Sequence, residues 1–338
     1  MQFLKNLFYN GDEQRLRMLW RVLFQTIIFG ILAIPGSILL VKLYSSTTGA
    51  TVTGGLDREA FMTFVTSHPP VMLLNAVLTG LPILISVYIA ARFFDKRSWK
   101  HFGLHRDKHW CAELKFGMLL GAGLMTGIFL VELLLGWITV TDVFHSEVQM
   151  SFFVAILFPL VNFIFVGFYE EVWSRGYLLT NFARGFRWLA NPKVAVIIGL
   201  VISSLIFGVS HASNPNATVV SSISISLVGI AFLGFGYIIT SSLAMPIGAH
   251  ITWNFFQGNI FGFPVSGTSI NSVTLFATQQ QGPELMTGGN FGPESGLLGI
   301  IAILAGMVIM AYWTRSRRGQ LQVVEAIAEK GEPQVTQE

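Results

Sequence analysis

Hydrophobic residues in this chain fall in long runs, separated by short polar stretches. A helix that crosses a bilayer needs about 20 mostly apolar residues, and runs of that length exceed what the strands of a soluble domain require. Eight segments qualify: Val22–Leu43, Val71–Phe94, Phe116–Val140, Phe152–Leu179, Val194–His211, Ile223–Ser241, Leu243–Gly262 and Gly296–Trp313. The pattern predicts an all-α, polytopic membrane protein with about eight transmembrane helices.

The composition agrees with a lipid environment. Hydrophobic residues make up 52% of the chain and charged residues 12%, against about 25% charged in an ordinary soluble domain. A single cysteine, Cys111, excludes a disulfide scaffold, and the apolar content excludes a disordered chain. The net charge of +3 is explained by the basic bias of cytoplasmic loops. We therefore expect the lipid bilayer, and no nucleic acid, as a partner.

Basic residues also predict the orientation. With the N-terminus inside, all of the 21 Lys and Arg residues except Lys42 and Arg58 fall on the cytoplasmic side of the predicted spans. This bias sets the topology of multi-pass proteins. It predicts that both termini are cytoplasmic (N-in and C-in), which requires an even number of spans.

The remaining segments indicate one transmembrane domain, residues 22–318. Residues 1–21 form a cytoplasmic N-terminal segment, whose apolar residues beside basic groups suit either an interfacial helix or a frayed terminus. The segment 263–295 is rich in Gly, Ser, Thr, Asn and Gln, and it is expected to form an outside loop or a poorly ordered linker. The charged segment 319–338 is expected to be a disordered cytoplasmic tail.

Ionisable residues inside the spans are the candidate functional residues. A charge in the hydrocarbon costs roughly 2.5–3.5 kcal/mol on insertion scales, so each one is a functional hypothesis by default. Glu132 lies alone in the third span. The others fall in three motifs of the fourth, fifth and seventh spans: Glu170-Glu171-Val-Trp-Ser-Arg175, Phe207-Gly-Val-Ser-His211 and His250-Ile-Thr-Trp-Asn254.

Helical spacing gives the two adjacent glutamates different partners. Glu171 and Arg175 lie at i and i+4, so they can pair on one face. Glu170 points about 100° away from its neighbour. One carboxylate can thus be neutralised by the arginine while the other stays available as a base.

The other two motifs supply histidines and an amide. His250 and Asn254 share one helical face, and the Phe207 ring can orient His211 from the same spacing. Hydrolysis of an amide requires a base that activates water and fixed donors that stabilise the oxyanion. Glu170 with His211 suits the first role, and His250 with Asn254 suits the second.

Each motif alone has a simpler explanation. The glutamate motif is typical of an interfacial charge cluster. His211 could lie in the headgroup layer, and Glu132 could form a hydrogen bond that helps two helices pack. A metal bound by two histidines and a glutamate is chemically possible, as is a proton relay. A serine or cysteine nucleophile is less favoured because no Gly-x-Ser-x-Gly motif occurs and Cys111 lies in a basic loop.

The three motifs, in this order, resemble the signature of the CAAX-protease and bacteriocin-processing family, also called CPBP or ABI. Its members carry EExxxR, FxxxH and HxxxN or HxxxD on successive transmembrane helices. The similar region here covers about residues 75–313. Two flanking pieces, HFGL at 101–104 and GGNFGPESGLL at 288–298, are similar to bacterial members and favour a bacterial plasma membrane.

The resemblance implies an intramembrane glutamic endopeptidase that uses no metal or other cofactor. Its substrate would be a membrane-associated peptide or a CAAX-like protein tail. The implied roles are water activation by Glu170 and His211, oxyanion stabilisation by His250 and Asn254, and support by Glu171, Arg175 and Phe207.

Two functions without proteolysis stay open. The chain could be a non-catalytic scaffold or a bacteriocin self-immunity factor that binds a peptide partner in the same cavity. Proton-coupled transport through Glu132, Glu170 and the histidines has less support, because no inverted repeat is visible.

The depths of the motif residues raise a difficulty. Counted along their helices, Glu170 and His250 lie roughly 15–16 Å from the cytoplasmic end, whereas His211 lies roughly 27 Å from it. We therefore expect the fifth helix to start outside the hydrocarbon, to tilt or to break, and we expect a cavity reached from the cytoplasmic half.

Overall fold

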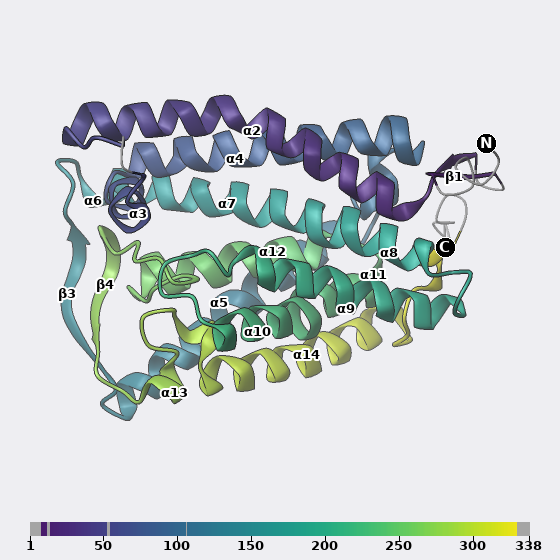
Figure 1. The fold of residues 1–338 in the computed structure, drawn as a ribbon. Coiled ribbons are helices and arrows are strands. Elements are labelled where there is room, and N and C mark those ends of the chain that lie inside the picture. Colours follow the sequence, from purple (N-terminus) through teal and green to yellow (C-terminus); the bar gives the residue numbers. More distant parts are fainter. Residues whose placement is uncertain (1–7, 12–13, 53–54, 106, 330–338) are drawn as a thin grey trace.

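The computed structural model describes residues 8–11, 14–52, 55–105 and 107–329 of the chain. Within these ranges seven helices are long and apolar enough to cross a membrane. Their bounds are α2 (Met18–Thr48), α4 with η1 (Pro69–Asp95), α5 (Trp110–Leu134), α6 to α8 (Phe152–Gly185), α9 (Pro192–Ser210), α10 to α11 (Val219–Thr240) and α14 (Leu297–Arg318). The chain is an all-α, multi-pass integral membrane protein, as its hydrophobic pattern predicts (Figure 1).

Several of these helices contain a turn of wider, π-helical winding. Such turns often occur at functional sites, and here one of them directly follows Glu171. The segments are η1 (Ala90–Asp95) after α4 (Pro69–Ile89), η3 (Val172–Leu179) between α7 (Leu157–Glu171) and α8 (Thr180–Gly185), η4 (Gly229–Gly234) between α10 (Val219–Val228) and α11 (Phe235–Thr240), and η5 (Phe256–Ile260) after α12 (Ala244–Phe255). The short helix α6 (Phe152–Ala155) precedes α7.

The eighth predicted span is α12 with η5, a shorter helix enclosed by its neighbours. Every residue from Ala244 to Trp253 is buried. The turn before it is buried as well, because Leu243 has no exposed surface and donates its backbone N–H to the carbonyl of Gly103. The helix therefore begins inside the protein, beneath the loop that carries η2 (Trp99–Phe102).

Glycines allow α12 to pack closely against α5 and α7. A Cβ atom at Gly121 of α5 or at Gly248 of α12 would collide with a backbone carbonyl oxygen of the facing helix. On α7, a Cβ atom at Gly167 would lie 2.7 Å from Cγ1 of Ile251. Small residues let helix backbones approach one another in this way, and the approach fixes the depth and rotation of α12.

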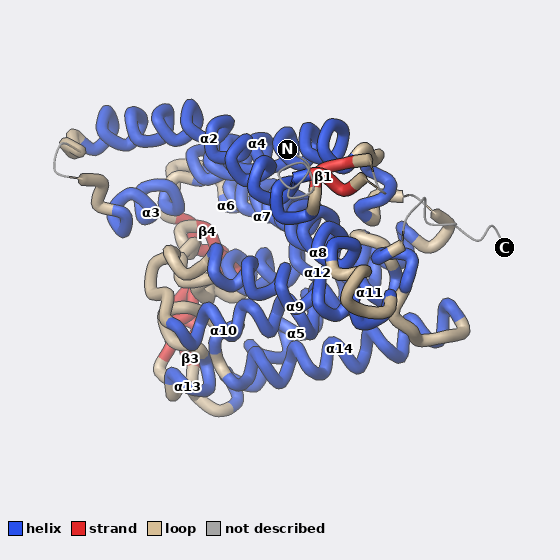
Figure 2. Tube along the Cα trace, turned by 45° about the vertical axis from the view of Figure 1, so that its right-hand side comes forward, coloured by secondary structure: helices blue, strands red, loops and turns tan. Residues whose placement is uncertain are grey.

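A small sheet closes one end of the bundle (Figure 2). β3 (Ile138–Ser146) pairs antiparallel with β4 (Val273–Gln280), with His145 opposite Thr274. The third predicted span therefore ends at Leu134 rather than Val140, because the residues from 138 onward pair with β4 instead of continuing the helix.

The 263–295 segment is an ordered part of this end of the bundle rather than a poorly ordered linker. Besides β4 it forms α13 (Glu284–Thr287) and η6 (Pro293–Ser295). Strand pairing and these short helices hold it in place. The nearby helix α3 (Arg58–Ser67) is a further element that the hydrophobic pattern does not predict.

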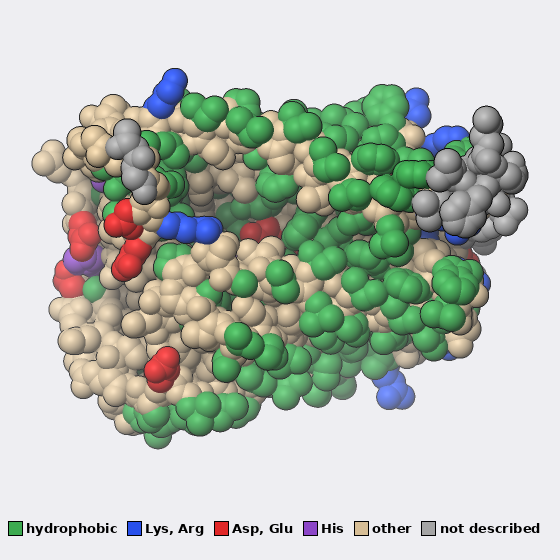
Figure 3. All heavy atoms as spheres, in the orientation of Figure 1, with side chains coloured by type: hydrophobic (Ala, Val, Ile, Leu, Met, Phe, Trp, Pro, Cys, Tyr) green, Lys and Arg blue, Asp and Glu red, His purple; other side chains and the backbone are tan. Residues whose placement is uncertain are grey.

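The two ends of the described chain lie together at the opposite end of the bundle (Figure 1). β1 (Tyr9–Asn10) pairs there with β2 (Arg15–Leu16). The seven long helices together with the shorter, enclosed α12 return the chain to the end where it begins. Between the two ends, hydrophobic side chains cover much of the face drawn in Figure 3, while acidic side chains gather at the end that carries the sheet.

The expected disordered tail is packed over its described part, residues 319–329. The backbone N–H of Val324 donates to the carbonyl of Ile238, and Ile327 in η7 (Glu325–Ala328) is 3% exposed. A short apolar stretch thus docks the tail despite its charged composition. The rest of the tail lies outside the described residues, as does much of the N-terminal segment for which an interfacial helix or a frayed terminus is expected. In the described part of that segment, Tyr9–Asn10 and Arg15–Leu16 pair as strands instead of forming a helix.

Candidate active site

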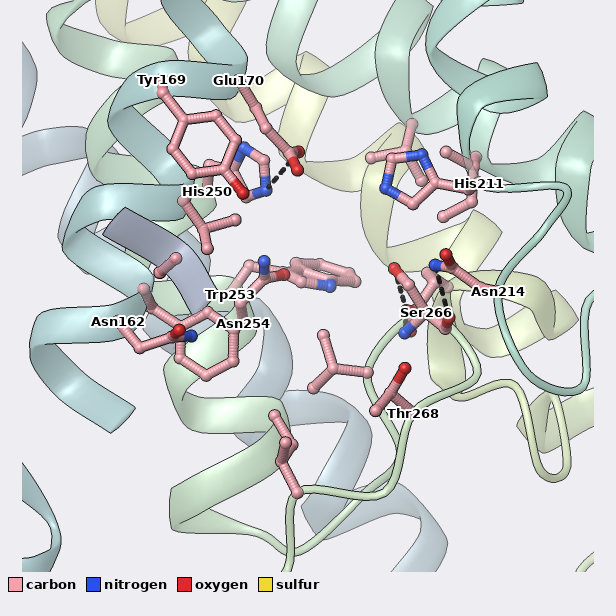
Figure 4. Close-up of a pocket in the computed structure, with 18 of the residues that line it drawn as sticks. Asn162, Tyr169, Glu170, His211, Asn214, His250, Trp253, Asn254, Ser266 and Thr268 are labelled. Carbon is pink, nitrogen blue, oxygen red and sulfur yellow. Dashed lines mark hydrogen bonds and ion pairs between the residues drawn. The ribbon is translucent and has the colours of Figure 1, made fainter. Parts of the chain in front are cut away.

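The four predicted catalytic residues line one cavity of about 210 Å³. Glu170 comes from α7, His211 from the C-terminal cap of α9, and His250 and Asn254 from α12. Figure 4 shows Glu170 and His250 on one side of the cavity and His211 on the other. The residues that the three motifs select therefore come from three separate helices and meet at one cavity.

The buried start of α12 accounts for the depth of His250, and α9 runs unbroken from Pro192 to Ser210. Counting from Thr240 treats the turn at Leu243 as a surface turn, whereas that turn has no exposed surface. His250 thus lies deeper than the count suggests. His211 also reaches back along α9, since its Nδ1 lies 2.8 Å from the carbonyl oxygen of Phe207, one turn earlier.

Glu171 holds His250 in position. Its Oε1 lies 2.8 Å from Nδ1 of His250 and accepts a hydrogen bond of 2.8 Å from Nη1 of Arg175. The carboxylate is fully buried and the arginine is 1% exposed. Because Nδ1 faces a carboxylate, this nitrogen carries the ring proton, which leaves Nε2 directed at the other glutamate.

Glu170 faces the same imidazole from the cavity side. Its Oε2 lies 3.8 Å from Nε2 of His250, and its side chain is 19% exposed. The adjacent glutamates therefore have different partners, as their rotation on the helix predicts. Glu171 is engaged by two donors, while Glu170 is accessible from the cavity.

Phe207 links the arginine to both histidines. Its ring lies 4.3 Å below the guanidinium of Arg175, a favourable cation–π geometry. It also lies 4.7 Å from the ring of His211 and 6.4 Å from that of His250, measured between ring centroids. Its supporting position agrees with the spacing of the FxxxH motif.

Glu294 of η6 is a cavity residue that the sequence reasoning missed. It is 3% exposed, accepts a hydrogen bond of 2.6 Å from the backbone N–H of Ser266, and is bonded to the side-chain amide of Gln257. Burial raises the pKa of Glu294 to about 7, although these hydrogen bonds act in the opposite direction. Its position in the flanking segment 288–298, which resembles bacterial members of the family, is the sequence feature that could have identified it as a site residue.

Glu132 is not among the residues that line the cavity. It is fully buried, and it accepts a hydrogen bond of 2.9 Å from Nε2 of Gln280. This contact joins α5 to the end of β4. The arrangement favours the interpretation of Glu132 as a hydrogen bonder in packing.

The cavity extends toward the end of the bundle that carries the sheet. A polar hollow of about 190 Å³ adjoins it, and the two share Met62, Thr66 and Thr268. Glu59 and Glu147 line this hollow. Loops at this end therefore form the outer wall of the site, and the lining does not support the expected approach from the half that the basic residues predict to be cytoplasmic.

A three-ligand metal centre has no counterpart in the described part of the chain. No group of three or more His, Cys, Asp or Glu side chains converges there as metal ligands would. At the histidines, Nδ1 of His250 already contacts Glu171, and Nδ1 of His211 contacts the Phe207 carbonyl.

Comparison with known proteins gives one match. Residues 152–256 match the family model of the type II CAAX prenyl endopeptidase Rce1-like proteins. This range includes all three motifs and all of the predicted catalytic residues. No curated protein sequence and no solved structure matches the chain. The chain is thus a multi-pass membrane protein whose residues 152–256 are similar to the Rce1-like domain of type II CAAX prenyl endopeptidases.

Proposed function

We propose that this protein is a metal-independent glutamic endopeptidase that hydrolyses a peptide bond in a membrane-associated peptide or a CAAX-like protein tail. The observation that carries the proposal is the placement of Glu170, partly exposed in the cavity, 3.8 Å from Nε2 of His250 and across the cavity from His211 (Figure 4). A carboxylate between two imidazoles suits the activation of water.

In the first step Glu170 takes a proton from a water molecule that His211 helps to orient. The water oxygen attacks the scissile carbonyl carbon, and the electron pair of the C=O double bond moves to the oxygen. The product is a tetrahedral oxyanion. Fixed hydrogen-bond donors stabilise such an oxyanion more strongly than mobile water does.

His250 and Asn254 are the donors in this scheme. The contact between Glu171 and Nδ1 of His250 directs Nε2 of that ring into the cavity, where an Nε2–H group donates to the oxyanion. The amide of Asn254, one turn further along α12, is the second donor. When the intermediate collapses, the C–N bond breaks and the leaving amine takes the proton that Glu170 received from water.

The substrate enters from the end that carries the sheet. The polar hollow beside the cavity, with Glu59 and Glu147, suits an extended polar segment of peptide, while the apolar bundle suits a membrane-embedded part. By the flanking motifs, the membrane is a bacterial plasma membrane.

A cleavage assay tests this proposal directly. Purified protein in detergent is given a quenched prenylated CAAX peptide and, separately, a pool of quenched unprenylated leader peptides. Wild type is expected to cleave at least one of them, and Glu170→Ala is expected to abolish that cleavage while membrane insertion and yield stay normal. Glu113→Gln, which changes a buried carboxylate on α5 paired with Arg318, serves as the matched control and keeps activity.

Full activity of Glu170→Ala would overturn the mechanism. Peptide binding without cleavage, retained in both Glu170→Ala and His211→Ala, would instead favour a non-catalytic scaffold or immunity factor.

A further inference from the structure

Four arginines gather around one carboxylate at the basic end of the bundle. Nη1 of Arg21, on α2, lies 2.5 Å from Oδ1 of Asp95 at the end of η1, and both side chains are buried. Arg15 of β2 and Arg184 of α8 are 7% and 6% exposed. Arg97 lies close enough to interact electrostatically with these three arginines and with Asp95. Of the described residues that act on Arg97, Arg184, Arg15 and Arg21 are basic and Asp95 is acidic.

Two buried guanidinium groups of this cluster, those of Arg97 and Arg21, have donors that no described residue accepts from. Burial first, and then the charges of Arg184 and Arg15, lower the pKa of Arg97 well below its usual range, although Asp95 acts in the opposite direction. Nη1 of Arg97 and Nε of Arg21 are buried without a hydrogen-bond partner in the part of the chain that the structure describes. Burying charged donors without partners is costly, so the cluster is suited to an anion.

A large cavity lies beside the arginines. Its volume is about 1050 Å³, and it lies between the first turns of α2, the end of α8 and the docked tail. Its basic wall includes Arg21 and Arg184 from the cluster, together with Arg17 and Arg187 nearer the surface. Glu329 is the acidic residue among its lining side chains.

The same cavity has an apolar wall. Leu19 and Leu23 project from α2, and Trp188 follows α8. These side chains are 67%, 45% and 80% exposed, respectively. Tryptophans are enriched where a protein meets the interface between lipid and water. Basic groups beside exposed apolar side chains, close to the lipid–water interface, suit a ligand that is itself amphiphilic.

We propose that this cavity binds the phosphate group of an anionic phospholipid, with the acyl chains lying along Leu19 and Leu23 of α2. Basic pockets between helices on the cytoplasmic side are suited to acidic lipid headgroups. A free phosphate ion would use the arginines but would leave the apolar wall exposed. The site is separate from the cavity of Glu170 and does not depend on proteolysis.

The test compares lipid and ion as sources of the phosphate. Delipidated full-length protein in detergent is titrated with phosphatidylglycerol, phosphatidylcholine or inorganic phosphate, and binding is followed by native mass spectrometry and by thermal stability. We expect phosphatidylglycerol to bind at least tenfold more tightly than phosphatidylcholine, and inorganic phosphate to have little effect. The double variant Arg17→Gln with Arg187→Gln should weaken phosphatidylglycerol binding by roughly fivefold for each charge removed.

A matched control keeps the change in net charge constant. Arg92→Gln with Arg315→Gln removes two exposed charges that do not line the cavity, and lipid affinity should be unchanged. Arg97→Gln gives an independent readout, because removing a repelled charge should not lower the thermal stability of the lipid-free protein. Equal affinity for the two lipids, equal loss in the two double variants, or stabilisation by inorganic phosphate as strong as by lipid would each overturn the assignment.

Discussion

Oε1 of Glu171 lies 2.8 Å from Nδ1 of His250, although 79 positions separate the two residues in the chain. The contact links α7 to α12 inside the bundle. The carboxylate that does not face the cavity thereby fixes the imidazole that faces Glu170.

Glu171→Gln is therefore expected to reduce turnover strongly while changing substrate affinity little. An amide preserves the size of the side chain but no longer offers His250 and Arg175 a carboxylate, so the imidazole is held less firmly. We expect kcat to fall by roughly 10²–10⁴-fold, the range found when the orienting carboxylate of a catalytic histidine is removed or when acid–base catalysis is lost. Steady-state kinetics on the cleaved peptide measure this change.

Glu113→Gln is the control for that variant. Glu113 is also a fully buried carboxylate paired with an arginine, but it does not line the cavity. Both variants are expected to lose stability, and Glu171→Gln alone is expected to lose kcat. An equal effect on kcat would contradict a positioning role for Glu171.

Gly248→Ala is expected to loosen the contact between α12 and α5. The added Cβ would collide with the Leu114 carbonyl, and overpacking of this kind costs roughly 1–3 kcal/mol. Because His250 lies two residues further along the same helix, activity should fall as well. Unfolding curves and cleavage rates of the same preparation measure both effects.

Gly123→Ala on α5 provides the comparison. A Cβ atom at Gly123 meets nothing within 4 Å, so stability and activity should be retained. If both substitutions were harmless, the helix contact would not be what sets the position of α12.

The buried carboxyl of Glu294 predicts a pH dependence of stability. Its folded-state pKa of about 7 lies above the value of 4.5 that applies to an unfolded chain, so the native state binds the proton more tightly. The free energy of unfolding contributed by this group is fully present below about pH 4.5 and is lost as the pH rises through about 7. At about 1.36 kcal/mol per pKa unit, the change is roughly 3 kcal/mol.

Glu294→Gln should remove this slope, because glutamine does not titrate. Denaturation midpoints measured between pH 4.5 and 8 provide the check. Glu284→Gln, an exposed carboxylate of the same segment, should leave the slope in place. An unchanged slope in Glu294→Gln would rule out this group as its source.

Chelation is expected to leave cleavage unchanged. In the described part of the chain no group of three or more His, Cys, Asp or Glu side chains converges as metal ligands would, so the proposed water activation rests on Glu170 and His211 alone. Rates are compared before and after incubation with EDTA or phenanthroline. Loss of activity that zinc restores would assign a metal to the site instead.

The helices and the convergence of the motifs could be predicted because both depend on local sequence. Lipid requires long apolar helices, and the costly polar residues inside them mark the site. Glu171 and Arg175 pair as their spacing predicts. The bond from Glu171 to His250 depends on how two helices pack, which spacing within a single helix does not reveal.

Other features depend on contacts between distant segments. Residues 138–141 alternate apolar and polar side chains, a strand signal, but they follow the third span closely and extend its apolar run. Glu294 is drawn into the cavity by Ser266 and Gln257, which lie far from it in the sequence. Loops form part of the cavity wall. Their polar composition predicts exposed loops, so the sequence does not reveal that they line the site.

The enclosed position of α12 has a consequence for how the site responds to the membrane. Outer helices such as α2, of which 11% of the apolar window is buried, adjust their tilt when the thickness of the hydrocarbon layer changes. α12 is buried from Ala244 to Trp253, so its depth is set by α5 and α7 and not by lipid. Hydrophobic mismatch would therefore be absorbed at the periphery of the bundle, and the spacing between His250, Asn254 and Glu170 would persist in bilayers of different thickness.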